Sequence, residues 1–193
     1  MASLQTFIFI GRSGSGKGTQ AVLLIHNFTQ RGEPVFYAET GKQIRQFLAT
    51  DSYSSRLATK LSLAGARQPD FLADYMWQNL LLNQFQGTEH LIFDGTPRSL
   101  VQAQTLDTAM AFYQRDLVHV IALHVSPDCA TGRLTKRGRS DDDVAGIQSR
   151  LAWYEKDVIP ALDYYRTNPR YRLVEVDGER PIEVVQAEIL AQC

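Results

Sequence analysis

One segment limits the possible folds of this chain more than any other: the glycine- and serine-rich run Gly11 to Thr19, which contains a single lysine. The β-branched and aromatic residues Thr6 to Ile10 before it predict a strand, and the apolar spacing from Ala21 to Phe28 after it predicts a helix. A loop in this position points backbone N–H groups and the positive end of the helix at a bound anion. Strand, loop and helix together define a P-loop, which a plain glycine-rich surface turn would not need.

The composition of this loop indicates that its residues bind the phosphates of a nucleotide. Glycine permits the φ angles and the close approach that a phosphate cradle requires. Lys17 supplies a mobile point charge for the β- and γ-phosphates. The general motif has serine or threonine directly after the lysine, whereas this chain has Gly18 there and Thr19 next. The loop residues expected to bind ATP are Gly14, Ser15, Gly16, Lys17, Gly18 and Thr19.

The rest of the chain alternates short apolar runs with longer helical stretches, which is typical of an α/β fold with a mostly parallel sheet. Further strands are predicted at about residues 35–38, 90–93, 117–125 and 172–176. Helices are predicted at about residues 41–64 with a break near 51–52, at 70–85, at 127–137, from 142 onward, and from 181 onward with Ile182, Val185 and Ile189 facing inward. The expected fold is a three-layer α/β sandwich around a five-stranded parallel sheet, of the P-loop NTPase type.

Length, charge and cysteine content disfavour several other classes of protein. A chain of 193 residues can form one sizeable core but no second full domain. Its net charge of −1 disfavours nucleic acid as a partner. Its two cysteines are too few for a zinc site built from cysteines alone. The apolar run Phe7 to Ile10 is too short for a signal peptide or a membrane span, so we expect a cytoplasmic protein with no membrane partner.

Several short motifs follow one another along the chain. They are Gly16-Lys17-Gly18-Thr19-Gln20, Thr40-Gly41 with Arg45, Gly65 with Pro69-Asp70, Asp94-Gly95-Thr96-Pro97-Arg98 with Gln102, and Arg133, Arg137, Arg139 and Arg150 with Asp141-Asp142. In this order they resemble the motifs of the adenylate kinase branch of the nucleoside monophosphate kinases. Each motif alone is modest evidence, but the set is highly specific. The resemblance implies reversible phosphoryl transfer from Mg-ATP to AMP, which gives two ADP.

The resemblance also implies a role for each matched residue. The residues implied in catalysis are Lys17, Arg98, Arg137, Arg139 and Arg150. Arg133 and Arg137 would join the loop in binding ATP, and Asp94 would hold Mg²⁺ through water. The residues implied in AMP binding are Thr40, Arg45, Gln68, Gly95, Arg98, Gln102, Arg139 and Arg150. Arginine suits a phosphate because its planar fork can bind two oxygens at once.

By the same resemblance, the chain is a single P-loop kinase domain, a monomer with two mobile parts. The core would comprise residues 1–39, 69–136 and 142–193, the acceptor-binding insert residues 40–68, and a very short lid residues 137–141. Only Gly138 separates Arg137 from Arg139, and the cysteines of a zinc-binding lid are missing. Closure of both parts is expected to gather the arginines and expel water.

Two local expectations concern the segment after the lid. Arg139 and Arg150 would share one helix face if the helix predicted from residue 142 extends back that far, because they are eleven residues apart. The run Asp141-Asp142-Asp143 could cap this helix and favour its dipole. By resemblance, Asp141 and Asp142 also help the lid to close over the arginines.

The identity of the acceptor base is less constrained than the reaction. Gln102 can pair with the edge of adenine through its amide, and Thr40 is also the choice of adenylate kinases. Lys42, Thr96 and the pair Arg67-Gln68 stand where the family commonly has other residues. The alternatives are therefore a kinase of UMP, CMP or dTMP, or a non-catalytic nucleotide-binding regulatory protein. A nucleic-acid-binding NTPase is disfavoured by the charge balance.

Overall fold

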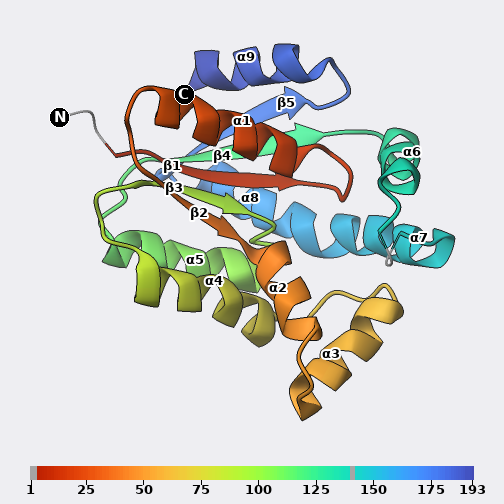
Figure 1. The fold of residues 1–193 in the computed structure, drawn as a ribbon. Helices are drawn as coiled ribbons and strands as arrows, with labels where there is room; N and C mark the ends of the chain where they lie inside the picture. Colours follow the sequence, from red (N-terminus) through yellow and green to blue (C-terminus); the bar gives the residue numbers. More distant parts are fainter. Residues whose placement is uncertain (1–3, 140–141) are drawn as a thin grey trace.

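The structure is a computed structural model, and it describes residues 4–139 and 142–193. Its centre is a five-stranded sheet in the order β2-β3-β1-β4-β5, and every neighbouring pair is parallel. The strands are β1 Thr6–Gly11, β2 Val35–Glu39, β3 His90–Asp94, β4 Val118–His124 and β5 Tyr171–Asp177. Helices cover both faces of this sheet (Figure 1). The expected three-layer α/β fold is confirmed.

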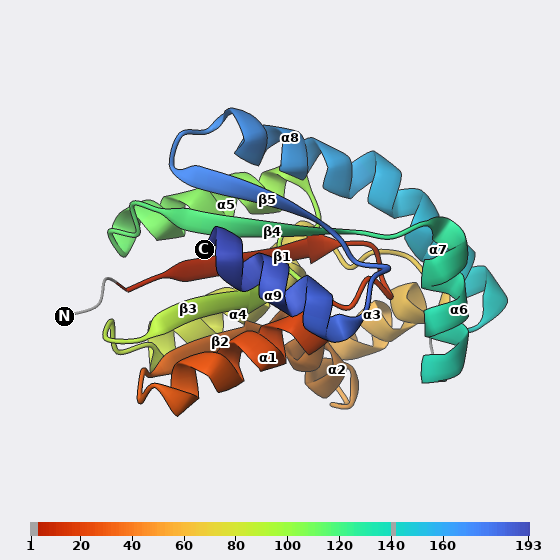
Figure 2. The same ribbon diagram turned by 90° about the horizontal axis from the view of Figure 1, so that it is seen from above.

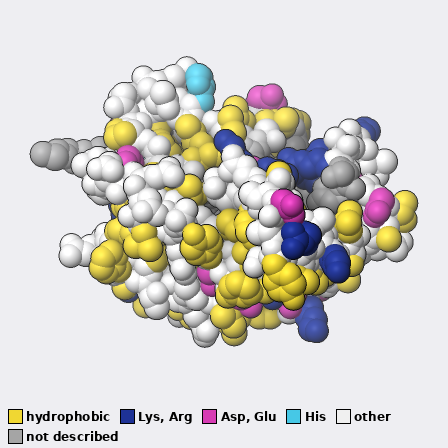
Figure 3. Space-filling view, turned by 60° about the horizontal axis from the view of Figure 1, so that its bottom comes forward, with side chains coloured by type: hydrophobic (Ala, Val, Ile, Leu, Met, Phe, Trp, Pro, Cys, Tyr) yellow, Lys and Arg dark blue, Asp and Glu magenta, His cyan; other side chains and the backbone are white. Residues whose placement is uncertain are grey.

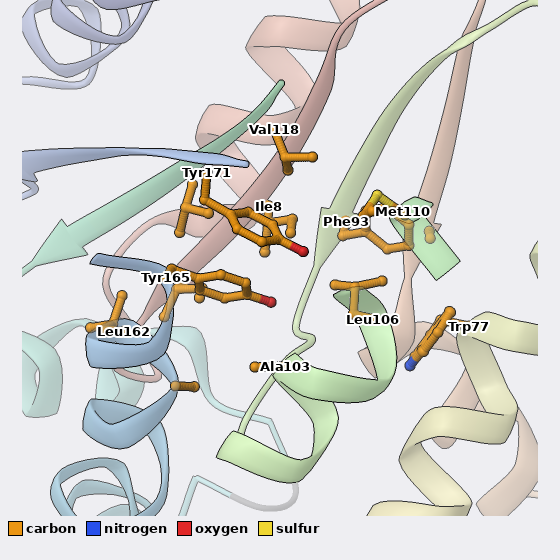
Figure 4. Packing of buried hydrophobic residues seen from close by; sticks show 14 of the residues in the cluster. Ile8, Trp77, Phe93, Ala103, Leu106, Met110, Val118, Leu162, Tyr165 and Tyr171 are labelled. Atoms are coloured by element: carbon orange, nitrogen blue, oxygen red, sulfur yellow. The ribbon is translucent and has the colours of Figure 1, made fainter. Parts of the chain in front are cut away.

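The two faces of the sheet are buried against different helices. On one face lie α1 Lys17–Gln30 and α9 Ile182–Gln192, and on the other lie α4 Asp70–Gln84, α5 Leu100–Phe112 and α8 Ile159–Thr167 (Figures 1 and 2). Side chains of a strand alternate between faces, so Phe7 and Phe9 pack with α1 and α9, while Ile8 and Ile10 pack with the opposite layer. Figure 4 shows this second layer, in which Trp77 and Leu106 pack around Phe93.

Four further helices lie near the carboxyl ends of the strands. They are α2 Thr40–Leu48, α3 Tyr53–Leu63, α6 Pro127–Arg137 and α7 Val144–Trp153 (Figure 1). The helices α2 and α3 share a small apolar cluster with the start of α4, and this cluster is separate from the two clusters on the sheet. Ser52 begins α3 with a reciprocal capping box, in which Ser55 is the partner. The segment from α2 to α3 therefore packs mainly against α4 and not into the two clusters on the sheet.

The helix after the lid differs from the sequence expectation. It begins at Val144, because Asp143 caps it by accepting a hydrogen bond from the backbone N–H of Gly146 at 2.6 Å. Arg139 therefore lies outside the helix, so the condition under which it would share a helix face with Arg150 is not met. The helix is also not continuous, because a π-helical turn at Tyr154–Val158 separates α7 from α8. Pro160 follows this turn, and proline can neither donate an N–H to the preceding turn nor fit against its carbonyl.

Two other differences concern apolar residues on helices. Residues 100–112 form α5, a helix that was not predicted from the sequence. Apolar side chains occur on more than one side of this helix, with Leu106 and Met110 buried and Phe112 exposed, which hides the helical period. Ile182 is 50% exposed, so the prediction that it faces the core is wrong. Val185 and Ile189 are buried, as expected.

Gly65 should be intolerant of any side chain. Its φ is +66°, and a Cβ there would lie 2.9 Å from the Cα of Gly146 and 2.9 Å from the Cβ of Ser149 on α7. We expect Gly65→Ala to lower the free energy of unfolding in urea by about 2–4 kcal/mol, from left-handed strain and overpacking together. The control is Gly87→Ala, where φ is +84° and no atom lies within 4 Å, so that only about 1–2 kcal/mol should be lost. Equal losses in the two variants would contradict the close packing of Gly65 on α7.

Candidate active site

A cavity of about 600 Å³ opens at the carboxyl ends of the parallel strands. Ligands of open α/β sheets bind at this edge, because the loops that follow the strands converge there. Most of the residues predicted from the sequence line it: Gly14, Ser15, Gly16, Lys17, Gly18, Thr19, Arg45, Asp94, Gly95, Arg98, Arg133, Arg137 and Arg139. Lys and Arg side chains gather on one side of the face shown in Figure 3, and hydrophobic side chains cover much of the other side.

The loop at the start of α1 has the geometry of a phosphate cradle. Gly16 caps the helix in the left-handed conformation, with a φ of 95°. Gly14 packs so closely on α6 that a Cβ would lie 2.8 Å from the carbonyl oxygen of Ala130. The Nζ of Lys17 donates to the carbonyl oxygens of Gly11 at 2.8 Å and Arg12 at 2.7 Å. The ammonium group is thus held at the mouth of the loop.

Lys17 and Asp94 both line the cavity and interact electrostatically. The pKa of Lys17 is lowered to about 8: burial is the largest cause, Asp94 opposes the shift, and Arg98 and Arg137 add to it. A Cβ on Gly18 would lie 3.2 Å from Oδ2 of Asp94. Glycine at the position where the general motif has serine or threonine therefore lets the carboxylate approach the start of α1.

Two arginines meet over the glycines of the predicted acceptor motifs. A Cβ on Gly41 would lie 3.1 Å from Nη1 of Arg45, and a Cβ on Gly95 would lie 3.1 Å from Nη2 of Arg98. The Nε of Arg98 also donates to the carbonyl oxygen of Gly95 at 2.8 Å. Burial lowers the pKa of Arg98, and the charges of Arg150 and other arginines add to this, against the attraction of Asp94. Excess positive charge at this point favours an anion.

The arginines that flank the lid converge on one carboxylate. Nε and Nη2 of Arg137 each donate to Asp142 at 2.8 Å, and Nη2 of Arg150 donates to it at 2.7 Å. The backbone N–H of Arg139 donates to it at 3.1 Å. Burial acts to raise the pKa of Asp142, but the hydrogen bonds from Arg137 and Arg139 hold it below the usual range. Asp141, the other predicted partner of the arginines, lies outside the described residues.

Four predicted site residues do not line this cavity: Thr40, Gln68, Gln102 and Arg150. Gln102 is fully buried, its Oε1 accepting from the backbone N–H of Arg98 at 2.7 Å and its Nε2 donating to Asp70 at 2.9 Å. It is therefore not an exposed helix residue. Gln68 is also buried and donates to the carbonyl oxygen of Ala58 at 2.9 Å. The buried hydroxyl of Thr40 makes no hydrogen bond within the part of the chain that the structure describes.

Sequence reasoning missed two cavity residues at the end of β2. The hydroxyl of Tyr37 donates to Oδ2 of Asp94 at 3.1 Å, and Glu39 forms an ion pair with Arg45 at 2.7 Å. Both side chains line the cavity, because residues two apart on a strand share a face. Their position directly before Thr40 is the signal that could have found them.

Sequence reasoning also missed residues that brace the donor loop. Arg12 of that loop donates to the carbonyl oxygen of Val125 at 2.9 Å, pairs with Glu155, and lies 4.6 Å from the ring centroid of Tyr154. Arg133, which was predicted, donates to the carbonyl oxygen of Gly178 at 2.9 Å. The loop is thus tied to the π-helical turn on one side, and the β5–α9 connection is tied to α6 on the other.

The site combines a glycine-rich loop that opens a helix, a half-buried lysine and converging arginines, all at the carboxyl edge of a parallel sheet. These features define a P-loop phosphotransferase. Comparison with known proteins narrows the class. The family model described as "Adenylate kinase" matches residues 9–170. The chain belongs to the adenylate kinase family.

Curated relatives match nearly the whole chain. An "Adenylate kinase" of Hyphomonas neptunium is 34% identical over 186 residues, which cover 94% of this chain and 94% of the relative. An "Adenylate kinase 1" of Synechocystis sp. is 32% identical over 189 residues, covering 98% and 97% of the two chains. An "Adenylate kinase" of Prochlorococcus marinus (strain MIT 9303) is 30% identical over 174 residues, covering 90% and 91%. Each of these matches therefore covers at least 90% of this chain.

Proposed function

We propose that this chain catalyses reversible transfer of the γ-phosphoryl group of Mg-ATP to AMP, giving two ADP. The observation that carries the proposal is the convergence of Lys17, Arg45, Arg98, Arg137 and Arg139 on one cavity. Phosphoryl transfer needs positioning and charge neutralisation rather than covalent chemistry by the protein. The names of the curated relatives support adenylate as the acceptor.

The proposed transfer divides the charged groups between two substrates. An oxygen of the AMP phosphate attacks the γ-phosphorus of ATP, and the bond from that phosphorus to the β–γ bridging oxygen breaks, leaving ADP. The attacking oxygen is already ionised near neutral pH, so no general base is needed. Lys17 and the loop would hold the donor phosphates, with Arg133 and Arg137 as further ATP ligands. Arg45, Gly95 and Arg98 would hold the acceptor phosphate.

The remaining groups are assigned to the transferring phosphoryl group and to the base. Arg139 and Arg150 would complete the charge around the group in transfer. Thr40, Gln68 and Gln102 would bind AMP near its base. The amide of Gln102 keeps one N–H and one lone pair after its bonds to Asp70 and Arg98, but the side chain is fully buried, so adenine would reach it only after neighbouring groups move.

Asp94 is the residue proposed to hold Mg²⁺ through water. Within residues 4–139 and 142–193 no three His, Cys, Asp or Glu side chains form a group that could hold a metal ion. The carboxylate of Asp94 at the cavity wall fits Mg²⁺, which keeps several waters and takes substrate phosphates as ligands. When bound, Mg²⁺ would neutralise charge on the β- and γ-phosphates. Tyr37 would keep Asp94 turned toward that position.

The division into parts is also proposed for this chain. Residues 40–68 would form the acceptor insert, which is supported by the packing of α2 and α3 in a small apolar cluster with α4, away from the two clusters on the sheet. Residues 137–141 would form the lid, which the pairing of Arg137 with Asp142 supports. We propose a cytoplasmic monomer. Among the residues that the structure describes, no helix has the length and apolar character to cross a membrane.

Incubation with Mg²⁺ and ADP alone provides the test of the proposed function. A reversible kinase of AMP should convert ADP into equal amounts of ATP and AMP, which ion-exchange chromatography separates. A control without enzyme accounts for spontaneous breakdown. Release of inorganic phosphate with no ATP formed would contradict the proposal and indicate a simple hydrolase.

A further inference from the structure

Two carboxylates lie side by side where β2 and β3 end. The register of these parallel strands pairs Glu39 with Asp94, and both residues line the cavity. Like charges on directly paired residues repel each other and destabilise a sheet. An unfavourable pairing of two carboxylates, at the edge of the sheet where ligands bind, indicates that these residues serve function and not stability.

Each carboxylate has a different partner. Asp94 accepts a hydrogen bond from Tyr37 at 3.1 Å, on the donor side near Lys17 and Gly18. Glu39 pairs with Nη2 of Arg45 at 2.7 Å, on the acceptor side. The two carboxylates therefore have separate roles. Asp94 lies on the side of the donor phosphates, and Glu39 forms an ion pair with Arg45 of the proposed acceptor site.

The Glu39–Arg45 ion pair is weak enough for another anion to replace Glu39 on Arg45. The two side chains are 29% and 47% exposed, and pairs at such exposure contribute about 0.2–1 kcal/mol. A guanidinium fork binds a carboxylate and a phosphate with the same geometry, so one anion can replace the other. The phosphate of a nucleotide carries nearly two charges at neutral pH, against one for Glu39.

We propose that Glu39 occupies Arg45 in the empty acceptor site and that an incoming acceptor phosphate must displace it, so that this carboxylate weakens acceptor binding. The inference rests on the proposed function, because it takes Arg45 to be a ligand of the acceptor phosphate. It makes Glu39 a determinant of acceptor affinity that selects doubly charged phosphates over weaker anions. A neutral side chain at this position would remove both the competition and the repulsion.

Calorimetric titration with AMP, in the absence of ATP, tests the proposal without relying on turnover. Glu39→Gln should lower the Kd for AMP about fivefold, which is the upper end of the contribution of an exposed ion pair. The matched control is Glu33→Gln, which makes the same change of charge at the other end of β2, where Glu33 pairs with Arg31 at 2.9 Å. This control should bind AMP as the unaltered chain does.

A double-variant cycle identifies Arg45 as the group through which Glu39 acts. Arg45→Met should weaken AMP binding, and adding Glu39→Gln to it should tighten binding by less than about twofold. Unchanged or weaker binding in Glu39→Gln, beside weakened binding in Arg45→Met, would overturn the inference and leave the proposed function standing. Unchanged binding in Arg45→Met would overturn the inference together with the assignment of Arg45 to the acceptor.

Discussion

Lys17→Ala should lower kcat for ADP formation from Mg-ATP and AMP by about 10³-fold, while the protein remains folded. The ammonium group is held at the mouth of the donor loop by two carbonyl oxygens, where it would neutralise charge that develops on the transferring phosphates. Removing one such preorganised donor from an active site typically lowers the rate by about 10²- to 10³-fold. A coupled assay measures the rate, and circular dichroism checks the fold.

The pH dependence of the reaction gives an independent readout of Lys17. Because its pKa is about 8 in the folded chain, the charged form is lost as the pH rises through 8, and kcat/KM should fall there. The residual activity of the alanine variant should lack this alkaline limb. Burial lowers the pKa from 10.5, so the unfolded chain binds more protons between these values and stability rises with pH in that window. Near-normal turnover by Lys17→Ala would sink its assignment as the donor-phosphate charge.

Arg98→Ala should reduce kcat/KM for AMP by at least about 10²-fold. This guanidinium is fixed against Gly95 and lies beside Arg45, so it would contact the acceptor phosphate during binding and transfer. Charge-assisted, bidentate contacts of this kind are about twice as strong as neutral hydrogen bonds. Arg98→Lys should restore little activity, because a point charge cannot reproduce the fork. Steady-state kinetics with AMP varied at saturating Mg-ATP measures the effect.

Arg31→Ala is the control for Arg98→Ala. Arg31 is exposed at the end of α1, where it pairs with Glu33 and lies 4.8 Å from the ring centroid of Phe28. The substitution removes the same charge far from the cavity and should leave kcat/KM within about twofold of the unaltered value. Similar losses in both variants would show that the effect of Arg98→Ala is not local to the site.

The fold was largely predictable because its central strands β1, β3 and β4 are buried on both faces. A strand of this kind is a short apolar run, as in Phe7 to Ile10, and each run is followed by a turn signal such as Asp94-Gly95. Helix α5 was missed because Leu106 and Met110 face the core while Leu100 and Phe112 do not. The pattern of such a helix gives no clear period until its neighbours are known.

The candidate site was predictable where one residue type carries the chemistry. The lysine of a glycine-rich loop can be recognised by itself, and Arg98 was recognised from its place in the ordered set of motifs; both residues line the cavity. The role of Glu39 could not be predicted from the sequence, because it depends on the strand register that pairs Glu39 with Asp94. The relation of Arg139 to Arg150 depended on where α7 begins, and the cap at Asp143 decides this.

The central claim is most directly tested by measuring ADP formation from Mg-ATP with AMP, GMP, UMP, CMP or dTMP in parallel, and with no acceptor. The convergence of the loop lysine and the arginines on one cavity, in a chain of the adenylate kinase family, predicts rapid ADP formation with AMP and little with the other monophosphates. Rapid turnover with another monophosphate instead of AMP would keep the transfer and contradict the adenine assignment. Slow ADP formation that does not depend on any acceptor would contradict the kinase itself.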